Sequence, residues 1–179
     1  MLARLSLYSQ VCRFVSRQIA KPGACARWCT LVPELNVLTT VAILFPGNAG
    51  TNLSSHQGAV LLFSVADGRL LSITDGHELT LIRTAAASAL ATRLLANPSP
   101  PDGCTLCMLG TGDQVLMHLV AIQAVRTVGK VTIWGRNLEH AEQRAAEIAA
   151  RGPDAPPVEV FSSAQEAVAD ADIVCTLTP

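Results

Sequence analysis

Residues 104–136 read CTLCMLGTGDQVLMHLVAIQAVRTVGKVTIWGR, and this stretch is the strongest indication of the fold. It contains a short apolar run, a Gly-x-Gly turn at Gly110 and Gly112, a helical segment and a second apolar run that ends at Gly135 and Arg136. This order predicts a β-α-β unit that opens a dinucleotide-binding fold. In such a unit the glycine turn lets backbone N–H groups and a helix N-terminus approach a pyrophosphate.

The end of the second apolar run indicates which dinucleotide is bound. An acidic residue at this place binds a free ribose 2′-hydroxyl, whereas an arginine suits a 2′-phosphate. Here Gly135 and Arg136 occupy it, which favours NADP(H). Val115 replaces the third glycine, so the motif depends on the strand and helix around it. Two alternatives stay open: a glycine turn that only tightens a strand-to-helix junction, and a solvated arginine at a strand end.

Strand and helix patterns alternate after this unit. Helical patterns over residues 138–151 and 164–171 separate strand patterns over residues 157–161 and 172–177. Alternation of this kind indicates a parallel sheet with right-handed crossovers. We therefore predict an α/β fold in which residues 98–179 form the N-terminal half of an NAD(P)-binding Rossmann domain, about two strands short of a complete doubly wound sheet.

The preceding part of the chain has a different organisation. Apolar runs over residues 35–45 and 58–74 predict strands, and Ala66-Asp67-Gly68 turns the second run into a β-hairpin. An alanine-rich helix is expected over residues 79–96. The sequence NPSPPDG at residues 97–103 then breaks regular structure and marks the best domain boundary. We predict part of an α+β domain before this boundary.

The first 34 residues differ from the rest of the chain. They contain five basic residues and no acidic residue before Glu34. This composition is typical of an organelle transit peptide, but the amphipathic pattern is imperfect and favours a poorly structured extension. We expect a cytoplasmic protein, or a mitochondrial one if this segment is a transit peptide. The three predicted segments are an extension at residues 1–34, a partial α+β domain at 35–97 and a half Rossmann domain at 98–179.

The overall composition excludes several classes of partner. Charged residues make up 15% of the chain and the formal net charge is −1, so no electrostatic attraction to nucleic acid or an anionic membrane is expected. No uninterrupted apolar run approaches the roughly 18–20 residues that span a bilayer. Hydrophobic residues make up 50% and aromatic residues 4%, which predicts a core of Ala, Leu and Val.

The cysteines and histidines give no metal site. Cys104 and Cys107 have the Cys-x-x-Cys spacing of metal and redox sites, but both fall inside a predicted strand and no second pair completes a zinc site. We expect them to be buried core thiols. His77, His118 and His140 show no metal-ligand spacing, and no Ser/His/Asp or Cys/His set is identifiable.

Two other polar groups are candidates for ligand contacts. Arg83 lies in an apolar stretch of the predicted alanine-rich helix, where a partly buried guanidinium would bind a carboxylate or phosphate. A surface salt bridge is equally compatible with the sequence. Ser55 and His56 directly precede an apolar strand, a position that suits a hydrogen-bond donor to a phosphate or a proton carrier. A structural role for this histidine is the alternative.

Several segments together resemble the ornithine cyclodeaminase/mu-crystallin family. They are SSHQGAVLLFSVADGRLLSITDGHELTLIRTAAASALATRLL, LGTGDQ, IWGRN, SSAQEAVADADIV and CTLTP. The resemblance covers about residues 35–179 and is strongest for mu-crystallin-type ketimine reductases. It implies a homodimer with a substrate and dimerisation domain joined to a Rossmann domain, and hydride exchange between NADPH, rather than NADH, and a small cyclic imino acid or amino acid. Mu-crystallin also binds thyroid hormone, which is therefore a further candidate ligand.

The resemblance also implies roles for individual residues. Arg83 would hold the substrate carboxylate. Residues 110–114 would surround the pyrophosphate, while Arg136 and Asn137 would bind the 2′-phosphate. The implied cofactor contacts are Ser55, His56, Arg83, Thr84, Gly110, Thr111, Gly112, Asp113, Gln114, Arg136, Asn137, Thr176 and Leu177, the last two bordering the nicotinamide.

The departures from the family pattern bear on activity. Val41 stands where the family has its lysine, and a valine neither donates a proton nor pairs with a carboxylate. The family's acidic residue falls beyond Pro179, and its amino-terminal substrate arginine has no counterpart in residues 1–34. We therefore expect a truncated NADPH-dependent ketimine reductase that is weakly active or inactive. The alternatives are a non-catalytic NADPH- or thyroid-hormone-binding protein, and an ornithine cyclodeaminase or alanine dehydrogenase-like enzyme.

Overall fold

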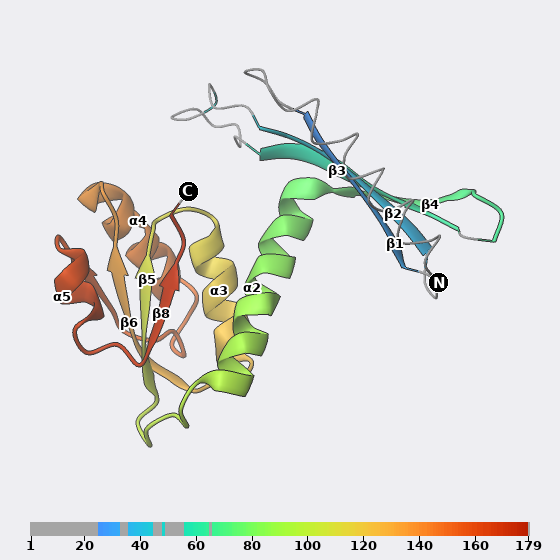
Figure 1. Cartoon of the computed structure of the whole chain (residues 1–179). Coiled ribbons are helices and arrows are strands. Elements are labelled where there is room, and N and C mark those ends of the chain that lie inside the picture. The colour runs from blue at the N-terminus through green and yellow to red at the C-terminus, as the bar shows by residue number, and fades with distance from the viewer. Residues whose placement is uncertain (1–24, 33–35, 45–47, 49–55, 65, 179) are drawn as a thin grey trace. The chain divides into compact units, whose positions relative to one another are not determined.

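The computed structural model describes residues 25–32, 36–44, 48, 56–64 and 66–178. The chain divides into two compact units, residues 1–80 and 81–179. Each unit contains one four-stranded sheet (Figure 1). None of the helices in the described ranges is long and apolar enough to cross a membrane. The division predicted from the sequence, with boundaries after residues 34 and 97, stays a prediction.

The first unit contains an antiparallel sheet with the strand order β1-β2-β3-β4. Its strands are β1 (Cys25–Val32), β2 (Asn36–Leu44), β3 (His56–Phe63) and β4 (Leu70–Asp75). The predicted hairpin is confirmed: Gly68 turns it with a φ of 74°, and the Ser64 N–H donates to the Arg69 carbonyl at 2.9 Å. Strand β1 was not predicted from the sequence, and it pairs along its full length with β2.

Helix α2 (Gly76–Leu95) follows β4 directly. It begins where the Asp75 carboxylate accepts hydrogen bonds from the His77 and Glu78 N–H groups, at 2.8 and 2.9 Å. These bonds satisfy two of the N–H groups that a helix start leaves unpaired. From Leu81 onward the helix belongs to the second unit.

The second unit contains a parallel sheet with the strand order β7-β6-β5-β8. This order is the 3-2-1-4 arrangement of a Rossmann fold and confirms the predicted α/β class and partial doubly wound sheet. Asp172 closes the pairing of β5 with β8, because its N–H donates to the Thr105 carbonyl at 3.0 Å and its carboxylate accepts from the Thr105 N–H at 2.8 Å. The elements are β5 (Cys104–Leu109), α3 (Gln114–Gln123), β6 (Val128–Trp134), α4 (Leu138–Ala149), β7 (Val158–Phe161), α5 (Ala164–Val168) and β8 (Ile173–Thr176).

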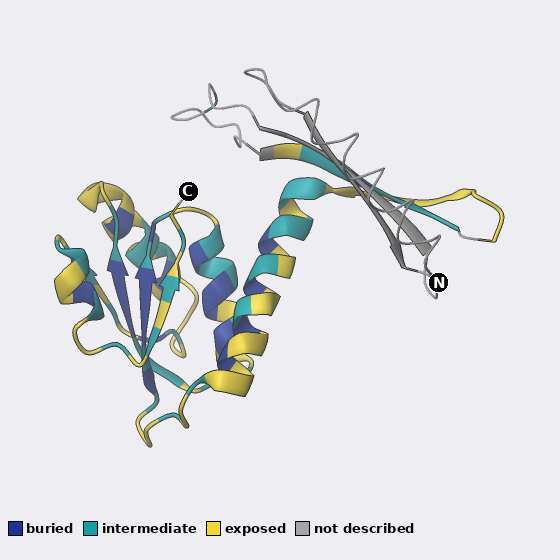
Figure 2. Ribbon diagram, in the orientation of Figure 1, coloured by how far each residue is buried: buried dark blue, intermediate teal, exposed yellow. Residues whose placement is uncertain are grey.

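The core of this unit lies between the two central strands and their helices (Figure 2). Leu106 and Ile133 from the strands and Leu119 from α3 are fully buried. The predicted core thiols are also confirmed: Cys104 and Cys107 are buried in β5, and burial raises the pKa of both. Apolar side chains on alternate faces of β5 are therefore covered from both sides, as parallel strands require.

Candidate cofactor site

The predicted glycine turn follows the carboxyl end of β5. In a parallel sheet the carboxyl ends of neighbouring strands meet at one edge, so the ends of β5, β6 and β8 lie together there. The chain order also reverses between β5 and β8, since the first strand of the unit lies next to the last. Such switch points are where open α/β sheets bind ligands.

Gly110 is held between the ends of the two neighbouring strands. Its N–H donates to the Trp134 carbonyl of β6 at 2.8 Å. A Cβ atom at Gly110 would lie 2.6 Å from the Leu177 carbonyl oxygen after β8, and its φ of 140° is one that side chains rarely permit. A Cβ atom at Gly135 would similarly overlap the Thr111 methyl group. Neither position has room for a Cβ atom, which only glycine lacks.

Gly112 has a different environment from Gly110. It is exposed, and a Cβ atom placed on it would meet nothing within 4 Å. The next residue, Asp113, is the N-cap of α3 but forms no capping hydrogen bond with its side chain. The side-chain Oε1 of Gln114, at the first position of α3, is buried without a hydrogen-bond partner. An open glycine, an uncapped helix start and an orphaned polar atom fit the pyrophosphate of a dinucleotide.

Arg136 and Asn137 follow strand β6. Arg136 is exposed and forms no hydrogen bond or ion pair with the described part of the chain. The Asn137 side-chain oxygen accepts the Glu139 N–H at 2.9 Å and so caps α4. Its amide NH₂ group is the part that could donate to a phosphate. A guanidinium and an amide donor at this strand end fit a 2′-phosphate.

Thr176 and Leu177 lie at the same edge of the sheet. Thr176 ends β8 and is exposed. The Leu177 N–H donates to the Leu109 carbonyl at 2.7 Å, so the chain continues alongside the end of β5. The structure thus brings these two residues to the glycine turn.

Sequence reasoning gave no role to His118, which the structure places between α2 and α3. The ring is 1% exposed, its Nδ1 lies 2.8 Å from the Gln114 carbonyl and its Nε2 lies 3.0 Å from the Ser88 hydroxyl. Because a carbonyl only accepts, Nδ1 carries the proton, and in the neutral ring Nε2 accepts from Ser88. The one available signal was the four-residue spacing from Gln114, which places both residues on one helix face.

This contact also fixes the register of α2 against α3. Further along both helices, the Arg126 guanidinium donates to the Thr92 and Ala96 carbonyls at the end of α2, at 3.1 and 3.2 Å. The two helices therefore run in the same direction. One helical turn before the Ser88–His118 contact stand Thr84 on α2 and Gln114 on α3, which places them at a similar level.

The register brings Arg83 and Thr84 toward the edge of the sheet that carries the glycine turn. Arg83 is exposed and has no hydrogen-bond or ion-pair partner among the described residues, whereas Thr84 is partly buried. A free guanidinium at this level is available to an anionic ligand. Ser55 lies outside the described residues, as do the side chains of His56 and Val41.

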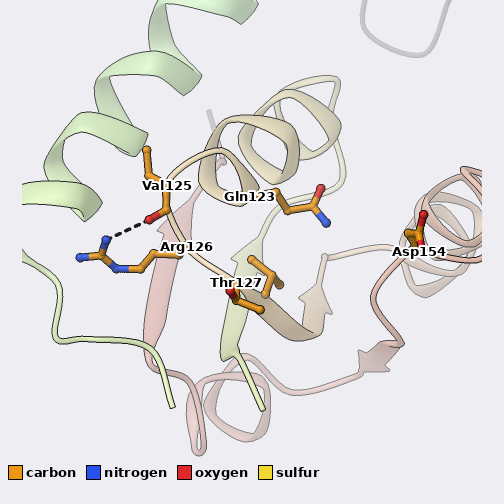
Figure 3. A pocket seen from close by; sticks show the side chains of 6 residues that line it. Gln123, Val125, Arg126, Thr127 and Asp154 are labelled. Atoms are coloured by element: carbon orange, nitrogen blue, oxygen red, sulfur yellow. Dashed lines mark hydrogen bonds between the residues drawn. The ribbon is translucent and has the colours of Figure 1, made fainter. Parts of the chain in front are cut away.

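A separate hollow of about 510 Å³ opens at the other edge of the sheet (Figure 3). Its lining comes from the segments that precede β6 and β7, and the Arg126 Nη1 there donates to the Val125 carbonyl at 2.9 Å. It therefore lies away from the glycine turn. The hollow is lined by Gln123, Val125, Arg126, Thr127, Val128 and Asp154.

Within the described ranges, no three or more His, Cys, Asp or Glu side chains come together in a way that could hold a metal ion.

Comparison with known proteins identifies the family. Residues 34–179 match the model of the "Ornithine cyclodeaminase/mu-crystallin family". The chain belongs to the ornithine cyclodeaminase/mu-crystallin family. The resemblance inferred from the sequence is thereby confirmed. The chain is 40% identical over 144 residues to the ketimine reductase mu-crystallin of Mus musculus, a match that covers 80% of this chain and 43% of the mouse protein.

Two solved structures have a similar fold. A lysine cyclodeaminase, studied for its recognition of L-lysine, L-ornithine and L-2,4-diaminobutyric acid, is 31% identical with a TM-score of 0.75, covering 89% of this chain and 45% of that chain. The iminosuccinate reductase of Paracoccus denitrificans, solved in complex with NAD⁺, is 28% identical with a TM-score of 0.70, covering 90% and 48%. This member of the family therefore spans less than half the length of each of these three proteins.

Proposed function

We propose that this chain binds NADPH at the glycine turn and is part of a ketimine reductase that acts on a small cyclic imino acid. The observation that carries the proposal is the turn between the ends of β6 and β8, with Gly112 open and Arg136 free at the end of β6. Family membership, the mouse ketimine reductase and the NAD⁺-bound iminosuccinate reductase support a nicotinamide cofactor. Arg136 supports NADPH in preference to NADH.

Different residues of the site would bind different parts of the cofactor and the substrate. The N–H groups of residues 112–114 would donate to the pyrophosphate, and Arg136 would pair with the 2′-phosphate. Arg83 would hold the carboxylate of the imino acid and orient its C=N bond. When bound, the cofactor supplies the hydride that the imine carbon accepts. Thr176 and Leu177 would border the nicotinamide, Asn137 the phosphate, and Ser55, His56 and Thr84 other parts of the dinucleotide.

The second candidate function is ligand binding without turnover. The nitrogen of a reduced imine must gain a proton, and Val41 occupies the position where family resemblance places a lysine. We therefore propose that turnover by this chain is weak or absent. Four further proposals rest on the resemblance. They are thyroid hormone as a ligand, an ornithine cyclodeaminase or alanine dehydrogenase-like activity, a homodimer and a cytoplasmic location.

The test is equilibrium binding of NADPH and NADH to the 179-residue chain, followed by NADPH oxidation with Δ1-piperideine-2-carboxylate. We expect saturable binding with a preference for NADPH, and Arg136→Met should reduce that preference by about tenfold because one charge-assisted contact is lost. Arg151→Met, at the exposed end of α4, is the control for loss of one positive charge. Binding without turnover would support the binder, and a folded sample that binds neither dinucleotide would refute the proposal.

A further inference from the structure

The proposed pyrophosphate site contains a carboxylate that should oppose it. Asp113 follows the open Gly112 directly and its side chain is 61% exposed. A negative charge beside the start of a helix is ordinarily favourable, but here it would repel the negative charges of the pyrophosphate. A site that binds a dinucleotide would need this charge to be compensated.

Arg144 of α4 supplies a compensating charge at this turn. Its side chain is 15% exposed, and its Nη2 lies 3.6 Å from the Asp113 Oδ1. The same guanidinium pairs with Glu147, three residues further along α4. Its position is thus fixed from two sides, with one ion pair on its own helix and one on the glycine turn.

Arg144 also contacts the backbone of the turn. Its Nε donates to the Thr111 carbonyl at 3.2 Å, across 33 residues of sequence. In a trans peptide the C=O and the following N–H point in opposite directions. Because the Thr111 carbonyl is held toward α4, the Gly112 N–H of the same peptide unit points away from α4.

We infer that Arg144 is a positioning residue of the cofactor site, which prepares the glycine turn for a pyrophosphate by neutralising Asp113 and by fixing the peptide unit between Thr111 and Gly112. The inference rests on the proposed dinucleotide binding. It adds a residue that no glycine motif contains, since Arg144 stands more than thirty positions after the turn.

The first test is a mutant cycle with NADPH and inorganic pyrophosphate as probes. Arg144→Met should weaken binding of both by about three- to tenfold, because a charge-assisted hydrogen bond and a partly exposed ion pair are lost. Asp113→Asn in the same chain should recover part of that loss, since it removes the negative charge that Arg144 no longer faces. Arg151→Met should change neither affinity by more than the general loss of one charge. Unchanged binding by Arg144→Met, or no recovery in the double variant, would overturn the inference.

The second test needs no bound cofactor. Amide hydrogen exchange of ligand-free protein should be faster in Arg144→Met at Gly110 and Val115, whose N–H groups are bonded to Trp134 and Gly112, and unchanged at Ala150 at the end of α4. Arg144→Lys keeps the charge but not the Nε donor and should give an intermediate rate. Equal rates in all three proteins would refute the role of Arg144 even if the wild-type chain binds no dinucleotide, a result that would separately refute the proposed function.

Discussion

The two glycines of the turn should respond in opposite ways to the same substitution. Gly110→Ala places a methyl group 2.6 Å from the Leu177 carbonyl oxygen and forces a φ of 140° on a residue with a side chain. A backbone in this region costs about 1–3 kcal/mol, and overpacking a close contact costs about 1–3 kcal/mol more. We expect a loss of about 2–6 kcal/mol, a large share of the stability of a small domain.

Gly112→Ala is the matched control, because it makes the same chemical change two residues away. Its added methyl group meets nothing within 4 Å, and its φ lies outside the left-handed region. The free energy of unfolding should therefore stay within about 0.5 kcal/mol of the wild type, or rise slightly as the unfolded chain loses freedom. NADPH binding should nevertheless weaken by about tenfold, since the methyl group occupies space that a pyrophosphate approaches.

The assay is urea unfolding followed by far-UV circular dichroism, with NADPH affinity measured on the same samples. The expected pattern is a lower midpoint for Gly110→Ala alone and a lower affinity in the stable Gly112→Ala protein. Equal stability of Gly110→Ala and the wild type would refute the close approach between the turn and Leu177. A loss of stability in Gly112→Ala as large as in Gly110→Ala would refute the assignment of open space to Gly112.

Three further predictions concern the second unit. Arg126→Met should destabilise it by about 2–3 kcal/mol in thermal unfolding, because hydrogen bonds from a charged group to carbonyls at the end of α2 are lost. An unchanged midpoint would contradict a stabilising role of these hydrogen bonds. Ser88→Ala should cost about 1–3 kcal/mol in urea unfolding, because the buried Nε2 of His118 loses its donor, while Ser88→Thr should retain part of that stability. Burial raises the pKa of Cys175 from 9.0 to about 11. The folded state thus favours the protonated thiol, so its contribution to stability is present below pH 9 and is lost as the pH rises toward 11. Cys175→Ala should weaken this fall in stability, and an identical pH profile would contradict the raised pKa.

Local sequence patterns were sufficient for most of the second unit. Apolar runs and the glycine turn predicted β5 and β6 because both signals act within a few residues. The last helix, predicted over residues 164–171, ends at Val168 in the structure, and helix ends are where local patterns say least. Strand β1 was missed because its pairing with β2 depends on residues outside its own segment.

The site could be predicted only as far as its motif. The glycine turn and Arg136 follow from spacing along the chain. The contacts of Arg144 with Thr111 and of Ser88 with His118 join residues about thirty positions apart, and no periodicity predicts which side chains meet across that distance. Asp113 was predicted only as a residue of the turn, because the effect of its charge depends on Arg144, which is distant in the sequence.

The pairing of β5 with β8 determines when this sheet can form during protein synthesis. Thr105 and Asp172 exchange hydrogen bonds across 67 residues, so β5 leaves the ribosome well before the strand that covers its second edge. At about 5–20 residues per second, that edge stays unpaired for roughly 3 to 13 seconds. An apolar central strand with one open edge is a site at which nascent chains pair wrongly. The nascent second unit should therefore depend most on chaperones in the interval between synthesis of β6 and of β8.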